Sequence, residues 1–313
     1  MKKYLTKELS NTFLLSLFYC EKEPEKFIKK LYAISNHVEN NYEIFEIKKK
    51  NGGKRTIYAP KRNLKKIQKE ILKNILNKMP VSSAACAYVP KKNIKENAKI
   101  HQNKNIVVKL DIKDFFGSIT FGEVLRKVFS YDYYPNGIAV LLTKLCTFYD
   151  FVPQGAPTSS YISNIVLKDF DEEVKTYCKK LNVDYTRYSD DLTFSGDFNI
   201  RSLISYIRTL LLKRGYLLNE QKIEVHHKNS GQLVTGIVVN ECLQVEKSYR
   251  KRIRQEVYYI KKFGLLNHMK RINVENKEQY IASLKGRINH CLNINKDDKE
   301  LQRYLKDIKS IKE

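Results

Sequence analysis

Two neighbouring acids, Asp190 and Asp191, occupy the centre of the segment VDYTRYSDDLTFSG. β-Branched and aromatic residues flank this short polar turn, which is the pattern of a β-hairpin. A third acid, Asp111, follows the apolar run IVVKL at residues 106–110, which predicts a buried strand. The sequence therefore predicts three carboxylates at the ends of adjacent strands.

Such a cluster constrains the chemistry as well as the fold. Carboxylates held together repel one another unless divalent cations lie between them. Two-metal phosphoryl transfer uses this arrangement to activate an attacking hydroxyl and to stabilise a leaving pyrophosphate. The alternative is a solvated acidic turn, which we expect for Asp297-Asp298 because no apolar strand flanks that pair.

The charge of the chain indicates its partner. The 313 residues carry 58 Lys and Arg against 34 Asp and Glu, a net charge of +24, and 42% are hydrophobic. A globular chain of this composition favours a polyanionic partner, nucleic acid first and an anionic membrane surface second. No run of 18 or more apolar residues is present, so we expect no transmembrane helix.

Cysteine and histidine patterns give no sign of a zinc site or a disulfide framework. The six cysteines show no CxxC spacing, so we expect reduced, mostly buried thiols in a cytoplasmic protein. His226-His227 has no partner at a metal-ligand spacing, which favours a solvated or loop pair. The short apolar run ending at Cys20 favours a docked amphipathic helix over a signal peptide.

Hydrophobic periodicity predicts the order of the elements. Helices are expected in residues 1–40, 64–76, 121–129, 138–148, 159–178, 200–215 and 247–313, and strands in residues 43–50, 54–59, 106–110, 233–240 and on both sides of the YSDD turn. Residues 247–313 carry 18 Lys and Arg against 8 Asp and Glu. A charge excess this one-sided favours phosphate binding over a merely solvated face.

Several motifs resemble one family when read in order. LDIKDFF with Asp111, PQGAPTSS with Gln154, and YSDD resemble the palm of reverse transcriptases over roughly residues 48–295. NAKIH at residues 97–101 and VTG at residues 234–236 are similar to signatures of the retron reverse transcriptases, a bacterial branch of the group II-like superfamily. The chain departs at Ser189, where Ala is common, and at Ser160, where Pro is common; neither position supplies a ligand or a proton.

The resemblance implies an α+β fold, the right-hand polymerase fold. Residues 1–105 would form N-terminal helices and fingers. Residues 106–245 would form the palm, an antiparallel sheet with helices, with finger and palm elements interleaved. Residues 246–313 would form a helical, basic thumb. With about 70 residues after the palm, we expect no RNase H, integrase or endonuclease domain.

The resemblance also implies catalytic roles. Asp111, Asp190 and Asp191, with the backbone carbonyl of Ile112, would hold two Mg²⁺ ions, for which Mn²⁺ is a possible substitute. Asp111 and Asp190 rank first among these ligands. Lys222 matches the palm lysine of the family, a candidate general acid, although a solvated lysine is an equal alternative.

Four residues are implied in binding the incoming nucleotide. Arg55 would grip the triphosphate with its planar guanidinium. Phe116 would be the steric gate that excludes a ribose 2′-hydroxyl, the alternative being a core Phe. Gln154 would support the nucleotide and the template base, and Gly155 would allow a close backbone approach.

A further group of residues is implied in binding RNA or primer. Tyr188 would pack near the primer terminus, and Val234-Thr235-Gly236 would lie at the primer grip. Lys285 and Arg287 lie on basic faces of the last helices. For Asn97 and His101 the sequence leaves two alternatives open, an RNA-facing role and a structural one.

By resemblance, the protein is a retron enzyme. It would copy a cognate structured non-coding RNA, encoded beside it, into branched multicopy single-stranded DNA, using dNTPs and starting from a guanosine 2′-hydroxyl. A basic thumb would hold an RNA stem–loop by shape and phosphates. Retrons commonly act in anti-phage defence beside an effector protein, so we expect such a protein partner. We expect no membrane partner.

Two other functions stay open. Another prokaryotic reverse transcriptase, of the group II intron or abortive-infection type, is the first. The second is a scaffold that binds the RNA–DNA hybrid and restrains an effector. The intact acids Asp111, Asp190 and Asp191 argue against a purely binding role.

Overall fold

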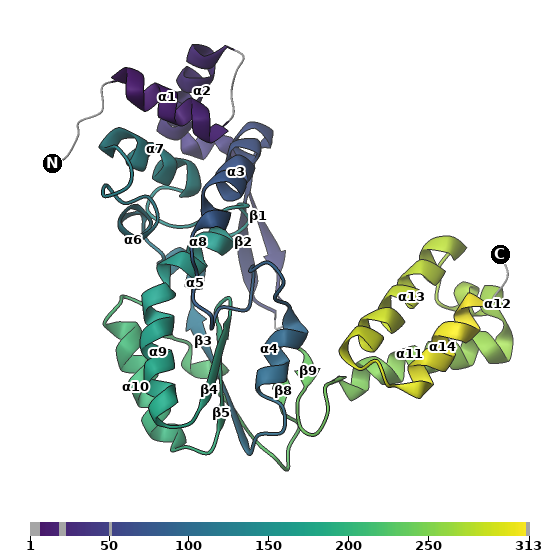
Figure 1. Ribbon diagram of the computed structural model, residues 1–313. Coiled ribbons are helices and arrows are strands. Elements are labelled where there is room, and N and C mark those ends of the chain that lie inside the picture. The colour runs from purple at the N-terminus through teal and green to yellow at the C-terminus, as the bar shows by residue number, and fades with distance from the viewer. Residues whose placement is uncertain (1–6, 19–22, 50–51, 311–313) are drawn as a thin grey trace. The chain divides into compact units, whose positions relative to one another are not determined.

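The computed structural model describes residues 7–18, 23–49 and 52–310 (Figure 1). Helices and strands are mixed, which confirms the predicted α+β class. The chain divides into two compact units, each built from separate stretches of sequence. The first unit comprises the described residues up to Lys91, with Lys109–Leu192 and Phe198–Glu224; the second comprises Lys92–Val108, Thr193–Asp197 and Val225 onward. The boundaries of fingers, palm and thumb at residues 105 and 245 stay a prediction.

The first unit begins with a group of packed helices. Their apolar stripes face one another, so Leu14, Leu31, Leu64 and Ile71 are fully buried. The predicted helices are present, although Cys20 lies outside the described residues. The bounds are α1 (Lys7–Phe18), α2 (Pro24–Asn36), η1 (Val38–Asn41), α3 (Arg62–Asn74), η2 (Leu76–Lys78), α6 (Phe121–Lys127) and α7 (Asn136–Cys146).

A two-stranded hairpin follows the first helices. Strand β1 (Tyr42–Lys48) pairs antiparallel with β2 (Lys54–Pro60), with Lys48 opposite Lys54. Gly52 has φ 86°, a conformation that favours glycine. The predicted hairpin is confirmed, but its tip residues Lys50 and Asn51 lie outside the described part of the chain.

A five-stranded sheet carries the predicted acids. Its strand order is β4-β5-β3-β6, and β7 also pairs with β3. Helix α9 packs against β4, and helix α10 packs against β6 (Figure 1). The bounds are β3 (Ile106–Lys113), β4 (Asp184–Tyr188), β5 (Asp191–Gly196), β6 (Leu217–Leu218), η3 (Glu220–Lys222), β7 (Glu224–His227), α5 (Phe115–Ser118), α9 (Lys168–Lys180) and α10 (Ile200–Leu212).

The long helix predicted over residues 159–178 is two helices. Helix α8 (Ser159–Val166) ends at Leu167, where ψ is 5°, and α9 starts at Lys168. No Pro or Gly marks this break, so the sequence pattern gives no signal for it. The buried face continues through the break, because Val166, Leu167 and Phe170 are all buried.

The prediction of one continuous strand over residues 233–240 is wrong. The segment is a tight hairpin of two short strands, β8 (Leu233–Val234) and β9 (Ile237–Val238), which pair antiparallel. Thr235 and Gly236 form its two-residue turn with φ 47° and 81°. Both turn residues are left-handed, as a type I′ turn requires. β10 (Gln244–Val245) adds a third strand beside β9.

The second unit places these strands in one core with five helices. The helices are α4 (Ile94–Ile100), α11 (Lys247–Phe263), α12 (Leu265–Arg271), α13 (Lys277–Ile294) and α14 (Lys299–Lys309). The predicted stripe is confirmed, since Leu284, Ile288 and Cys291 are buried in this core. Asp298 is not a solvated turn residue. Its carboxylate caps α14 at Leu301 N and pairs with Arg250 at 2.9 Å.

The described residues were also compared with the expectations for membrane-spanning helices and for cysteines. None of the described helices is both long and apolar enough to span a bilayer. The five described cysteines are free thiols, four of them buried, as predicted.

Candidate active site

Asp111 lies on β3 with its carboxylate almost fully buried and held by two side chains. Asn219 Nδ2 donates to Oδ1 at 2.9 Å, and Lys222 Nζ donates to Oδ2 at 2.7 Å. The backbone of Asn219 also donates to the Asp111 carbonyl at 2.8 Å. Asn219 and Lys222 belong to the short turn after β6, which pairs with β3. Both side chains that bind this acid therefore come from the turn that follows the neighbouring strand, β6.

The two remaining acids lie at the turn between β4 and β5. Ser189 adopts φ 63°, a left-handed conformation that costs a non-glycine residue roughly 1–3 kcal/mol. Ile112 N donates to the Asp190 carbonyl at 3.1 Å, which fixes the turn against β3. The structure thus places Asp111 and Ile112 on β3, Asp190 in the β4–β5 turn and Asp191 at the start of β5, so the three acids lie at the ends of adjacent strands, as the sequence predicted.

The three acids interact electrostatically. Burial raises the pKa of Asp191 to about 6, and the charges of Asp190 and Asp111 add to this. Burial also raises the pKa of Asp190, with a further contribution from Asp111. The hydrogen bond to Asp111 raises the pKa of Lys222, which keeps its ammonium charged at neutral pH. The site holds more negative charge than Lys222 alone can neutralise.

The donor set is suited to a hard divalent cation. Carboxylate oxygens and a backbone carbonyl are the ligands that Mg²⁺ prefers. Among the described residues, however, no three His, Cys, Asp or Glu side chains already converge as a metal site. Each Asp111 oxygen accepts one hydrogen bond and retains a second lone pair that could bind a metal ion.

Removing one of these acids should stabilise the metal-free protein. The folded-state pKa of Asp191 is above the value of 3.8 for an unfolded Asp, so stability is lost as pH rises through about 6. The loss is at most about 3 kcal/mol, taking 1.36 kcal/mol per pKa unit. In EDTA, Asp191→Asn should therefore raise the urea midpoint at about pH 7.5 but hardly change it near pH 4.

Asp150, an exposed acid in a turn, provides the control. Asp150→Asn should leave both midpoints unchanged. A destabilised Asp191→Asn protein at about pH 7.5 in EDTA would contradict the assignment of unbalanced charge to this site.

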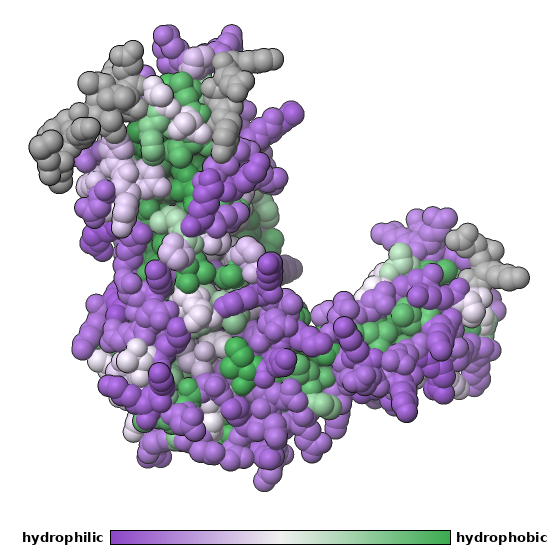
Figure 2. Space-filling model, viewed as in Figure 1, coloured by the Kyte–Doolittle hydropathy of each residue, from purple (hydrophilic) through white to green (hydrophobic). Residues whose placement is uncertain are grey.

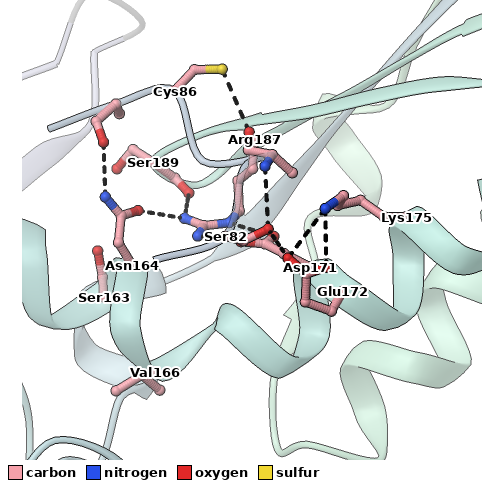
Figure 3. Close-up of polar contacts among 12 residues, drawn as sticks. Ser82, Cys86, Ser163, Asn164, Val166, Asp171, Glu172, Lys175, Arg187 and Ser189 are labelled. Atoms are coloured by element: carbon pink, nitrogen blue, oxygen red, sulfur yellow. Dashed lines mark hydrogen bonds and ion pairs between the residues drawn. The ribbon is translucent and has the colours of Figure 1, made fainter. Parts of the chain in front are cut away.

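A buried arginine, Arg187, donates a hydrogen bond to the backbone of the acidic turn (Figure 3). Arg187 is fully buried and binds the Asp171 carboxylate bidentately, with Nε–Oδ1 2.8 Å and Nη2–Oδ2 2.7 Å. Its Nη1 donates to Asn164 Oδ1 at 3.1 Å and to the Ser189 carbonyl at 3.0 Å. Tyr185 donates its hydroxyl proton to Asp171 as well, at 2.8 Å. This network links the YSDD turn to helices α8 and α9.

The PQG loop lies directly against strand β2. Tyr58 N donates to the Gln154 carbonyl at 2.9 Å. Gly155 has φ 124°, and a Cβ there would meet the Tyr58 carbonyl oxygen at 2.8 Å. The close approach that requires glycine is therefore to β2. Arg55 is exposed three residues earlier on the same strand.

Phe116 follows the Asp111 strand at the start of a single helical turn. Asp114, at φ 44°, redirects the chain after β3. Phe116 is partly exposed, whereas Phe115 is buried, and the two ring centroids are 5.2 Å apart. Its partial exposure permits a contact with a bound sugar; its role as a gate stays a prediction.

The NAKIH and VTG motifs meet in the second unit. Asn97 and His101 are fully buried. Asn97 Nδ2 donates to Thr235 Oγ1 at 3.4 Å, and His101 Nδ1 lies 2.7 Å from Ser195 Oγ. Burial favours the structural alternative for both residues. Val234 is buried and Gly236 exposed, so contact with nucleic acid would fall to the turn.

The remaining predicted RNA-binding residues differ in exposure. Tyr188 and Lys285 are partly exposed. Arg287 is held by Glu256, with both nitrogen–oxygen distances 2.6 Å. Its guanidinium is therefore committed to an internal ion pair. Their roles in binding RNA stay predictions.

Two residues of the site were missed by sequence reasoning. Asn219 lies three residues before Lys222 in a turn that periodicity does not detect. Arg187 interrupts the apolar alternation VDYTRY, and that interruption was the available signal. Its acid partner Asp171 lies 16 residues away, on a helix.

Comparisons with known proteins identify the family of this chain. The family model "Reverse transcriptase (RNA-dependent DNA polymerase)" matches residues 47–262. The retron Mx65 reverse transcriptase of Myxococcus xanthus is 34% identical over 79% of this chain, and the retron Ec86 reverse transcriptase of Escherichia coli is 32% identical over 70%. The Ec83 enzyme of E. coli is 34% identical over 72%.

These matches cover most of the relatives' length as well. The chain spans 65% of the Mx65 protein, 70% of the Ec86 protein and 78% of the Ec83 protein. The residues matched by the family model, 47–262, include β3 and the β4–β5 turn. The chain therefore belongs to the reverse transcriptase (RNA-dependent DNA polymerase) family, and within it to the retron reverse transcriptases.

Proposed function

We propose that this protein is an RNA-directed DNA polymerase that copies its own structured RNA into branched single-stranded DNA. The observation that supports the proposal is the electrostatic coupling of Asp111, Asp190 and Asp191, which come from β3, the β4–β5 turn and the start of the neighbouring strand β5. The names of the retron relatives support RNA as the template.

Three acids would hold two Mg²⁺ ions together with the Ile112 carbonyl. When bound, the ions supply activation of the attacking hydroxyl and stabilisation of the leaving pyrophosphate. Asn219 keeps the Asp111 carboxylate in one orientation, since it binds both the side chain and the backbone of that residue. Lys222, released from Asp111, would donate a proton to the leaving pyrophosphate oxygen.

Neighbouring elements would position the nucleotide. Arg55 would bind the triphosphate from β2, and the hydrogen bond between Tyr58 and Gln154 would keep that strand in register with the PQG loop. Phe116 would exclude ribonucleotides by bulk. Because the acids, Phe116 and the PQG loop all belong to the first unit, nucleotide selection and chemistry would share one unit.

The RNA would also supply the primer. We propose that synthesis starts from a guanosine 2′-hydroxyl of the bound RNA, giving an RNA–DNA branch. The basic helices of residues 247–313 would hold a stem–loop of that RNA through its phosphates. The proposed protein partner is an effector that acts with the enzyme in anti-phage defence. We propose that both are in the cytoplasm.

Expression of the gene with its flanking DNA tests this function. Small nucleic acids are extracted and run before and after treatment with debranching enzyme. We expect a discrete DNA band whose mobility changes on debranching and which is absent from cells expressing Asp190→Asn.

Other results would identify the alternatives. Extension of an added primer–template without a branched product would indicate a reverse transcriptase of the group II intron or abortive-infection type. RNA binding without any synthesis would favour the scaffold.

A further inference from the structure

A small cavity lies between helices α11 and α12 of the second unit. Its volume is about 230 Å³, and it is lined by Tyr259, Phe263, Asn267, His268 and Arg271. Drug-sized ligands occupy pockets of roughly 300–1,000 Å³, so this cavity is suited to a single ring system.

Flat side chains dominate the lining. Tyr259 stacks on His268 with centroids 5.9 Å apart and an interplanar angle of 23°. Phe263 lies 6.0 Å from Tyr259 at 31°. Arg271 places Cζ 5.3 Å from the Tyr259 ring centroid. Aromatic faces and arginine planes together form the platform on which unpaired nucleobases stack.

His268, one of the polar residues of the lining, is oriented by a chain of hydrogen bonds. Arg287 binds the carboxylate of Glu256. Burial raises the pKa of Glu256, but the hydrogen bonds from Arg287 and Tyr280 and the charge of Arg287 outweigh burial and keep this pKa below its usual value. Tyr280 donates its hydroxyl proton to Glu256 at 2.9 Å and can therefore only accept from His268 Nε2, 3.1 Å away. The neutral His268 ring then carries its proton on Nε2 and a lone pair on Nδ1.

This Nδ1 atom has no hydrogen-bond partner in the described part of the chain, although His268 is only 4% exposed. A buried acceptor without a partner destabilises the protein, and an N–H group of a ligand would satisfy it. Because His268 lines the cavity, its stacking surface lies beside this unpaired acceptor. A nucleobase presents both complements, a flat face and N–H donors at its edge.

The surroundings favour a polyanion. Residues 247–271 carry nine Lys and Arg and a single acid, Glu256. Phe263 and Leu266 remain exposed at 46% and 63% beside these charges. In Figure 2 hydrophilic residues cover most of the visible face of helices α11–α14, with apolar residues showing between them. A nucleic acid with its phosphates outside the cavity and one base inside it would bind both the basic residues and the apolar ones.

We propose that this cavity binds one unpaired base of the RNA, and that Arg287, Glu256 and Tyr280 are positioning residues that fix the His268 tautomer. The inference rests on the proposed function, because the base would belong to the RNA that the enzyme holds. It adds recognition of a base to binding that shape and phosphates alone would otherwise provide.

Binding of RNA octamers to the full chain tests the proposal. The probes are single-stranded oligo(A), oligo(U) and oligo(C), each with a matched octamer whose central base is removed, and fluorescence anisotropy gives Kd. Phe263→Ala and His268→Gln should weaken binding of at least one intact octamer about tenfold, equivalent to about 1.4 kcal/mol. Neither should alter binding of its abasic counterpart.

Tyr258→Ala is the matched control, since Tyr258 is an equally exposed aromatic of α11, at 53%, that does not line the cavity. It should change Kd less than twofold. Gln at position 268 retains an amide N–H for Tyr280 while removing the Nδ1 acceptor, and thermal melts verify folding. Equal losses for Tyr258→Ala and Phe263→Ala, or equal affinity for intact and abasic octamers, would overturn the proposal.

Cross-linking separates this inference from the proposed function. An octamer with 4-thiouridine at its centre should cross-link to Tyr259 or Phe263, as mapped by mass spectrometry, in both the wild type and Asp190→Asn. Cross-links at the cavity in a wild-type protein that synthesises no DNA would support the pocket and reject the function. Synthesis with cross-links only elsewhere would reject the pocket and leave the function.

Discussion

Replacing Asp190 with Asn is expected to lower the rate of primer extension by at least about 10³-fold without unfolding the protein. If Asp190 holds a catalytic metal ion as proposed, its loss removes several kcal/mol of transition-state stabilisation, and about 1.4 kcal/mol corresponds to each factor of ten. The folded state should tolerate the change, because burial and Asp111 already raise the Asp190 pKa. Single-nucleotide incorporation on a short primer–template measures the rate.

Asp297→Asn is the control for this prediction. Asp297 belongs to the second Asp-Asp pair of the sequence and is exposed. Its neutralisation should leave the rate within about twofold of the wild type, since exposed charges contribute little. A rate retained in Asp190→Asn would show that the candidate active site has been wrongly assigned.

Replacing Arg187 with Met should destabilise the fold by roughly 3–5 kcal/mol. The substitution leaves the buried Asp171 carboxylate without its bidentate partner, and an unpaired buried charge is among the most costly defects. At about 2–4 °C per kcal/mol, the melting temperature should fall by roughly 10 °C. Urea unfolding and thermal melts measure both quantities.

Arg208 offers a matched control. It binds Glu220 with the same bidentate geometry, at 2.7 and 3.0 Å, but about half of each side chain is exposed. Arg208→Met should therefore cost less than about 1 kcal/mol. A similar loss in both variants would contradict the argument that burial gives the Arg187 pair its importance.

The double variant Arg187→Met with Asp171→Leu separates stability from function. An apolar pair can replace a buried ion pair with little loss, so most of the stability should return. Primer extension should not return with it, because the Ser189 carbonyl still lacks the donor that holds the turn. Full recovery of both would reduce Arg187 to a purely structural residue.

The sequence predicted the parts of the site that depend on local pattern. The apolar run before Asp111 and the alternation around Asp190 identify two strands, and strand ends bring their acids together. Periodicity also predicted the buried stripe of α13, including Leu284 and Ile288. These features need only short stretches of chain, which is why one sequence suffices to predict them.

The missed features depend on partners far along the chain. The Asp111–Asn219 hydrogen bond joins residues 108 apart, and that between Asn97 and Thr235 joins residues 138 apart. No local pattern encodes such pairings. The hairpin at Thr235 was missed because a non-glycine residue takes a left-handed conformation there, against the usual turn chemistry.

The division of the first unit among three stretches of sequence has a consequence for how the protein reaches its active form. Helices α11–α14 are contiguous, and short-range contacts form quickly. Asp111, Asp190 and Asn219 must instead be gathered from three distant points, each at a large cost in loop-closure entropy. We expect the acidic cluster to be among the last regions to assemble during folding. A nascent chain would gain its catalytic centre only after β6 has left the ribosome, so that the protein emerges without polymerase activity until most of it has been made.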